Sequence, residues 1–115
     1  MSLSFRPVRE EWGEACSCFI DADEVVRLLR IMADILDIPS EHHSYADNVS
    51  VWIEDGTKLL DYIESRRFTA RSVARLTGLK AKALKPLVGN MKALARKWRE
   101  AVGVNGELHF YVDAF

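Results

Sequence analysis

Residues 68–87, FTARSVARLTGLKAKALKPL, decide the fold that this sequence predicts. Thr69 is a residue type that caps helix N-termini, and Gly78 is the type that ends a helix in a left-handed conformation. The apolar and small residues have the spacing of two packed helices: Val73, Ala74 and Leu76 in the first, Leu79 beneath the turn, and Leu84 and Leu87 in the second. The segment therefore predicts a helix, a tight turn at Gly78 and a second helix.

Charge is divided between two blocks of the chain. Residues 1–65 carry five basic and fourteen acidic side chains, a net charge of −9. Residues 66–100 carry eleven basic side chains and one acid, Glu100, a net charge of +10. The formal net charge of −1 for the whole chain hides this division. A basic block this dense predicts an anionic partner, such as a nucleic acid or a membrane surface.

The spacing of residues 68–87 resembles the helix-turn-helix of bacterial and archaeal DNA-binding proteins, over about twenty of the 115 residues. The resemblance implies a recognition helix that begins near Lys80 and reads base edges with Lys80, Ala81, Lys82 and Lys85. Neighbouring basic residues would contact phosphates. The candidate DNA-binding set is Arg66, Arg67, Arg71, Arg75, Lys80, Lys82, Lys85, Lys92 and Arg96. Because lysine reads fixed base patterns poorly, we expect weak sequence preference, or specificity through dimerisation.

Pro86 lies about two turns into the expected recognition helix. Proline removes one backbone hydrogen bond and clashes with the preceding turn, which costs roughly 3 kcal/mol in a straight helix. Two outcomes fit the sequence. The helix kinks at Pro86, or a short helix ends at Lys85 and a new one starts at Pro86.

Two further amphipathic helices are expected at 22–37 and 49–65, because apolar residues recur there at three- and four-residue steps. Asp21 is a suitable cap for the first of them, and Pro39 ends it. The polar segments 1–14 and 39–47 show no such period and are expected to be irregular.

Near the C-terminus, Leu108, Phe110 and Val112 alternate with polar residues, which predicts a strand at 107–113 with one buried face. A short β-compatible run at 15–20 is its expected partner. This strand stands where a winged-helix protein places its wing.

The expected fold class is mainly α. It comprises a helix-turn-helix trihelical core, to which 49–65 contributes, with one or two extra helices and a small two-stranded β element. Residues 1–115 form a single domain. Its parts are an acidic helical half at 1–65, a basic helix-turn-helix half at 66–102 and the terminal strand at 107–113.

A long apolar stripe runs from Leu84 to Val102 and recurs near a seven-residue step. Two uses are open: packing against the domain's own core, or a seam between two copies, which two-fold DNA sites would favour.

The bulk composition favours a soluble, cytoplasmic protein with no membrane contact. No run of eighteen apolar residues is present, and the first residues lack the apolar stretch of a signal peptide. Cys16 and Cys18 are too close in the chain for an unstrained disulfide, so reduced thiols are expected.

Catalytic and metal-binding residues are not expected. Cys16, Cys18, His42, His43 and His109 match no common zinc-ligand spacing. The sequence contains no glycine-rich phosphate loop, HExxH motif or nucleophile elbow, so no enzyme activity and no cofactor are predicted. Acidic residues on 49–65 (Glu54, Asp55 and Asp61) fit a solvated face or partners of the basic block.

These observations lead to the hypothesis of a small protein that binds double-stranded DNA. Transcription regulation, or an accessory role in a phage or plasmid, is what the resemblance suggests. A homodimer and a protein partner for the acidic half are also considered. The alternative is a protein–protein adaptor or assembly module that uses its opposed acidic and basic halves.

Overall fold

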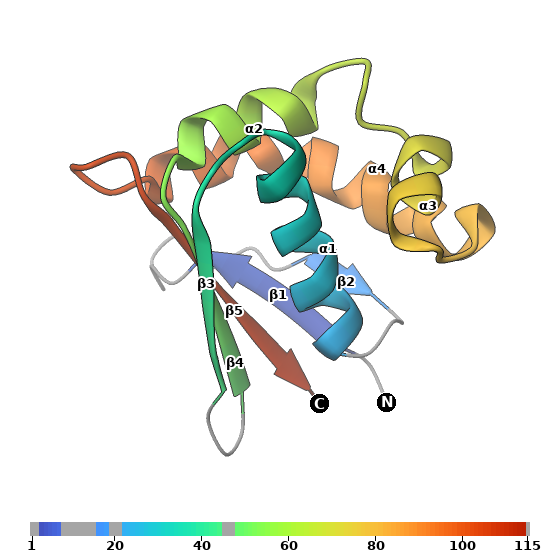
Figure 1. Ribbon diagram of the computed structural model, residues 1–115, viewed down its shortest axis with the longest axis horizontal. Helices are drawn as coiled ribbons and strands as arrows, with labels where there is room; N and C mark the ends of the chain where they lie inside the picture. Colours follow the sequence, from blue (N-terminus) through green and yellow to red (C-terminus); the bar gives the residue numbers. More distant parts are fainter. Residues whose placement is uncertain (1–2, 8–15, 19–21, 45–47, 115) are drawn as a thin grey trace.

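The structure, a computed structural model, describes residues 3–7, 16–18, 22–44 and 48–114. Five strands form one antiparallel sheet in the order β2-β1-β5-β4-β3, so the C-terminal strand lies at its centre (Figure 1). The strands are β1 (Leu3–Pro7), β2 (Cys16–Cys18), β3 (Ser40–Ser44), β4 (Asn48–Ile53) and β5 (Leu108–Ala114).

Helices cover one face of this sheet. They are α1 (Ala22–Ile35), α2 (Gly56–Glu64), α3 (Ala70–Thr77) and α4 (Ala81–Trp98), and α4 continues into the short 3-10 turn η2 (Arg99–Ala101). Helix α1 packs on β3, β4 and β5 and also contacts α3. Helices α2 and α3 both pack on α4, and α3 lies beside the beginning of α4 at one end of the molecule (Figure 1).

Side chains of the central strands alternate between the two faces of the sheet. Val51 and Phe110, which lie opposite each other in the register, are fully buried beneath the helices. Trp98 of α4 packs edge-on against Phe110, with ring centroids 5.4 Å apart. On the other face, Trp52 lies opposite His109, which is exposed. The core therefore sits between the helices and one side of the sheet.

The predicted helix at 22–37 is confirmed as α1, which ends two residues earlier. Val25, Leu28, Leu29 and Met32 are buried, as the three- and four-residue spacing requires. The apolar stripe of residues 84–102 packs into the core of the same chain. Leu84, Met91 and Trp98 have no more than trace exposure. These three side chains therefore show the first of the two expected uses, packing against the domain's own core.

The predicted fold class is wrong. The protein is not mainly α with a trihelical core and a two-stranded element, because a five-stranded sheet forms its centre. Strand β5 pairs with β1 on one side and β4 on the other, and not with the 15–20 run, whose strand β2 pairs with β1. A central strand of this kind is not the wing of a winged-helix protein.

The prediction of one helix over 49–65 is also wrong, since this segment forms strand β4 and the shorter helix α2. The change occurs at Asp55 and Gly56. The Asp55 carboxylate accepts a hydrogen bond from the backbone N–H of Lys58 (3.0 Å) and caps α2. A Cβ atom at Gly56 would lie 2.5 Å from Cβ of Leu108, so only glycine allows α2 to begin this close to β5.

The segments 1–14 and 39–47, predicted to be irregular, contain β1 and β3. Strand β3 has four exposed residues out of five, and a strand without a buried face leaves no alternation in the sequence.

Candidate nucleic-acid interface

Helix α3 carries two exposed basic side chains, Arg71 and Arg75, and its N-terminus is capped. Thr69 and Ser72 form a capping box, in which each side chain bonds the backbone N–H of the other residue (3.1 Å in both directions). Val73 is buried, and this fixes the face of α3 that packs inward. Arg71 and Arg75, one turn apart, are therefore exposed together on the opposite side.

The turn after α3 is held by Gly78 and Thr77. Gly78 adopts the left-handed conformation with φ 77°, as predicted, and its N–H donates to the carbonyl of Ala74. The buried Thr77 hydroxyl donates to the carbonyl of Val73 (2.8 Å) and accepts from the N–H of Leu79 (3.2 Å). The sequence placed Leu76 inward, but Leu76 is 40% exposed and Thr77 takes the inward position.

Helix α4 begins with an open N-terminus among lysines. Lys80 is the extended N-cap residue, no side chain caps the helix, and the first turn contains no acid. Lys80, Lys82 and Lys85 are all exposed. The free N–H groups and the positive end of the helix dipole here favour an anion.

Pro86 lies inside α4, which runs from Ala81 to Trp98 without a break. Neither a helix ending at Lys85 nor a new helix starting at Pro86 is observed. Pro86 is exposed. The carbonyl of Lys82, four residues earlier, has no N–H partner at position 86, because proline has none to donate.

Lys92 differs from the other residues of the predicted set because its amine is used within the protein. Its Nζ donates to the backbone carbonyls of Ile63 (3.0 Å) and Ser65 (2.6 Å) and lies 5.5 Å from the centre of the Phe68 ring. These carbonyls are at the C-terminal end of α2, where a cation is favoured. Lys92 therefore fastens α4 to α2 and is not presented to a ligand.

Arg99 is also engaged internally. It donates from Nη2 to Asp61 (2.7 Å) and from Nε to Glu64 (2.9 Å), both on α2. The hydrogen bond to Asp61 is the main cause that raises the pKa of Arg99. The sequence left two roles open for Asp61, a solvated face or a partner of the basic block. Its contact with Arg99 shows that it pairs with the basic block.

The remaining eight predicted residues are exposed. We call this set the basic surface: Arg66, Arg67, Arg71, Arg75, Lys80, Lys82, Lys85 and Arg96. None of them forms an ion pair with any residue in the described part of the chain. Arg67 stacks over the Tyr62 ring, 5.4 Å from its centre. At 100° per residue, Lys82, Lys85 and Arg96 fall on one flank of α4, away from its buried side.

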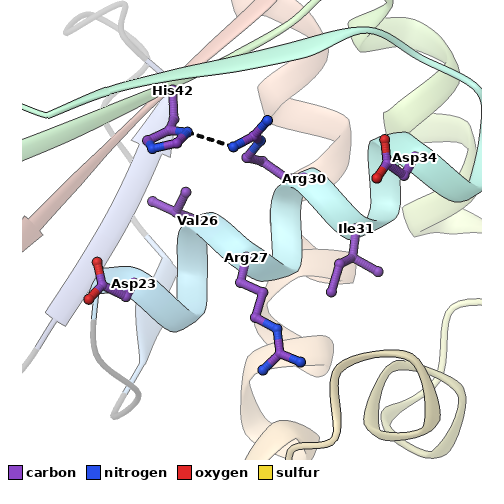
Figure 2. A pocket seen from close by; sticks show the side chains of 7 residues that line it. All are labelled: Asp23, Val26, Arg27, Arg30, Ile31, Asp34 and His42. Atoms are coloured by element: carbon purple, nitrogen blue, oxygen red, sulfur yellow. Dashed lines mark hydrogen bonds between the residues drawn. The ribbon is translucent and has the colours of Figure 1, made fainter.

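A second feature, not predicted from the sequence, is a groove of about 350 Å³ along the exposed face of α1 (Figure 2). Arg27 and Arg30 line it together with Asp23, Asp34 and two apolar side chains. His42 of β3 closes one side, and its Nδ1 accepts a hydrogen bond from Arg30 (2.8 Å). Both signs of charge are present, so the groove does not share the single-sign character of the basic surface.

Among the residues that the structure describes, no three His, Cys, Asp or Glu side chains are grouped in a way that could hold a metal ion. None of the described helices has the length and apolar character needed to cross a bilayer. The side chains of Cys16 and Cys18 lie outside the described part.

Searches against protein-family models, curated proteins and solved structures gave no match to this chain.

Proposed function

We propose that the protein binds double-stranded DNA through the basic surface of α3 and α4. The observation that carries the proposal is the set of eight exposed cationic side chains without an ion-pair partner in the described residues: two on α3, three on α4, Lys80 in the turn between these helices, and Arg66 and Arg67 just before α3. Arginine and lysine left unpaired by their own protein are available to neutralise phosphates.

The N-terminus of α4 supports the same proposal. Its uncapped N–H groups lie next to Lys80 and Lys82, and helix N-termini bind phosphate through such groups. Arg75 on α3 and Lys80, the N-cap residue of α4, flank the turn at Gly78, so both sides of this turn carry positive charge. Arg71 and Arg75 would contact phosphates along one stretch of a DNA strand. Lys82 and Lys85 would lie at a groove of the DNA duplex.

We expect the affinity for duplex DNA to depend little on the base sequence. The side chains at the start of α4 are lysines, which act as mobile point charges, and no asparagine or glutamine stands among them to recognise adenine. Binding through phosphates would be tolerant of sequence and strongly dependent on salt.

The test is a fluorescence-anisotropy titration of mixed-sequence duplex DNA over a series of salt concentrations. The logarithm of affinity should fall linearly with the logarithm of salt, by about 0.9 per neutralised phosphate. Replacing Arg71, Lys82 and Lys85 by alanine should weaken binding more than tenfold at low salt and reduce the slope by about 2–3.

A matched control removes the same three charges elsewhere. Arg27, Arg30 and Lys58 are exposed and lie outside the basic surface, so their triple alanine variant should keep most of the affinity and the full salt slope. Equal loss of binding in the two triple variants would show an effect of net charge alone, and would reject the basic surface as the interface.

One observation favours a protein partner as the second candidate. Leu76, an apolar residue 40% exposed, lies on α3 next to Arg75. An aliphatic side chain has no charge or hydrogen-bond donor with which to bind a phosphate. An adaptor that binds an acidic protein would use such a residue at the centre of a charged contact. Absence of duplex binding at low salt, with retained binding to a partner that depends on Leu76, would favour this function over DNA binding.

A further inference from the structure

Strand β3 is one of the two edge strands of the sheet, and most of its residues are exposed. It pairs with β4 on one side only, and no described strand lies on its other side. Glu41, His42, His43 and Ser44 are all exposed. An edge of this kind offers unpaired backbone N–H and C=O groups to another strand.

The backbone pairing with β4 determines which residues of β3 point outward. The N–H of Glu54 donates to the carbonyl of Pro39 (3.0 Å), which makes Pro39 and Glu54 a hydrogen-bonded pair next to the β3–β4 ladder. Hydrogen-bonded and non-bonded pairs alternate along an antiparallel ladder. Glu41 and His43 therefore direct their backbone groups toward β4. The backbone groups of the alternate residues, Ser40, His42 and Ser44, face outward.

We infer that β3 pairs with β3 of a second copy of this chain, antiparallel and centred on His42, to form a two-fold dimer with a continuous ten-stranded sheet. The sequence of β3, Ser-Glu-His-His-Ser, is complementary to its own reverse. In this register His42 lies opposite His42 of the partner subunit, and Ser40 lies opposite the partner's Ser44. These outward-facing residues supply the hydrogen-bonded pairs.

The same register places complementary side chains opposite each other, a carboxylate and an imidazole that can donate a hydrogen bond to it. Glu41 lies opposite the partner's His43, and the reciprocal pair forms on the other side of the two-fold axis. These are non-hydrogen-bonded pairs, in which side chains approach most closely. Glu41 and His43 already share the face of the sheet away from the helices, where Oε2 of Glu41 lies 3.6 Å from Nε2 of His43. Both side chains are well exposed, at 66% and 59%.

His42 is oriented for this arrangement on the helix side of the sheet. Its Nδ1 accepts from Arg30, which can only donate, so the ring is held in place beside α1 (Figure 2). The groove carries both signs of charge and so does not favour an anionic peptide, whereas the side-chain pattern of β3 matches a second β3 in the antiparallel direction. This match selects a second copy over an unrelated peptide.

The contact is short, with five residues from each subunit, so we expect a weak dimer that depends on concentration. Sedimentation velocity or light scattering across a series that reaches about 1 mM should show a monomer–dimer equilibrium. A monomer at all concentrations would overturn the proposal.

Hydrogen exchange tests which backbone groups take part. In the dimer, the amides of Ser40, His42 and Ser44 should exchange more slowly than in dilute protein, while those of Glu41 and His43 should change little.

Two charge variants test the register. E41K places lysine opposite the partner's His43, and H43E places glutamate opposite the partner's Glu41, so each variant alone should weaken dimerisation at least tenfold. Mixed together, they pair lysine with glutamate on one side and histidine with glutamate on the other, and should form a heterodimer. Thermal unfolding of each variant establishes that it is folded. Wild-type dimerisation by either variant, or no association in the mixture, would overturn the register.

A backbone variant tests the hydrogen bonds. H42P removes the outward N–H at the centre of the contact, a position that an edge strand tolerates because this N–H has no partner among the described residues of the monomer. H42A keeps the N–H, and both variants lose the Arg30 contact equally. H42P should be monomeric where H42A still dimerises. Equal dimerisation by the two variants would overturn the proposal.

Discussion

Nζ of Lys92 lies 3.0 Å from the carbonyl oxygen of Ile63, twenty-nine residues earlier in the chain, and 2.6 Å from that of Ser65. One side chain of α4 thus satisfies two carbonyls at the end of α2, a place where a helix leaves such groups without partners. Lys92 is half-buried, and its ammonium group also lies over the Phe68 ring. These contacts fix α2 against α4, and with it the turn from which Arg66 and Arg67 project.

Replacement of Lys92 by methionine should therefore destabilise the protein. The variant keeps an apolar stem on Phe68 but leaves the carbonyls of Ile63 and Ser65 without their donor, so the free energy of unfolding should fall by about 1–3 kcal/mol. Urea unfolding measures the change. K85M is the control, because Lys85 is exposed on the same helix and should change stability by less than about 0.5 kcal/mol. Equal stabilities of the two variants would contradict the role of Lys92.

The stability of the turn between α3 and α4 should depend on glycine at position 78. Gly78 has φ 77°, and nothing lies within 4 Å of a Cβ built there, so the penalty of alanine comes from the backbone conformation alone. We expect G78A to lower the free energy of unfolding by about 1–2 kcal/mol.

Gly89 provides the opposite control for this prediction. It lies inside α4 with helical geometry and with open space around its Cβ position. G89A should raise the free energy of unfolding by about 0.5–1 kcal/mol, because alanine is the better helix former. The same sign of change in both variants, measured by urea unfolding, would show that Gly78 is not required for its left-handed conformation.

The sequence predicted α1, α3, the turn and α4 because each has a local signal. The capping residues, the glycine and the three- and four-residue apolar spacing lie within the element that they specify. Strand β4 is ambiguous by the same criteria. Val49, Trp52 and Ile53 fit a helix, whereas Val49, Val51 and Ile53 fit a strand. The neighbouring strand β5, sixty residues away, decides between them.

The difference between local signals and distant partners also explains which residues of the candidate site were predicted correctly. Eight of the nine predicted residues are exposed, since charged side chains seldom lose their water without a partner. Lys92 was misplaced because its partners are backbone carbonyls, which have no residue-specific signal in a sequence. The edge strand β3 was missed for a similar reason: its pairing uses the backbone, and its side chains are polar on both faces.

The start of α2 should not accept any side chain larger than glycine's hydrogen. A Cβ atom at Gly56 would meet Leu108 Cβ at 2.5 Å and the carbonyl oxygen of Gly106 at 3.1 Å, and neither is the free end of a flexible chain. We expect G56A to lower the free energy of unfolding by about 1–3 kcal/mol, since α2 must move away from β5. A thermal midpoint equal to that of the wild-type protein would show that the two elements separate without penalty.

The ion pairs of Arg99 should show no pH dependence near neutrality. The pKa of Arg99 is raised in the folded protein, so the charged form stabilises the fold, and this contribution is complete below the pKa of the unfolded chain. It is lost only as the pH rises through the still higher value of the folded state. The difference in unfolding free energy between wild type and R99M should therefore stay constant from about pH 6 to pH 9. Because Arg99 is about one-third exposed, the difference should be at most about 1 kcal/mol. A difference that varies across this range would contradict this assignment.

The orientation of α3 can be tested at two neighbouring positions that the sequence placed on the same side. Val73 is 1% exposed and Leu76 is 40% exposed. V73A should lower the free energy of unfolding by about 1–3 kcal/mol, because it removes apolar contacts and leaves space in the core. L76S should change it by less than about 0.5 kcal/mol, since Leu76 already contacts water. If L76S were the more destabilising variant, α3 would be rotated, and Arg71 and Arg75 would not share the exposed side. With the observed orientation, L76S should also leave duplex binding unchanged, and so separate the DNA-binding proposal from the adaptor in a protein whose fold is intact.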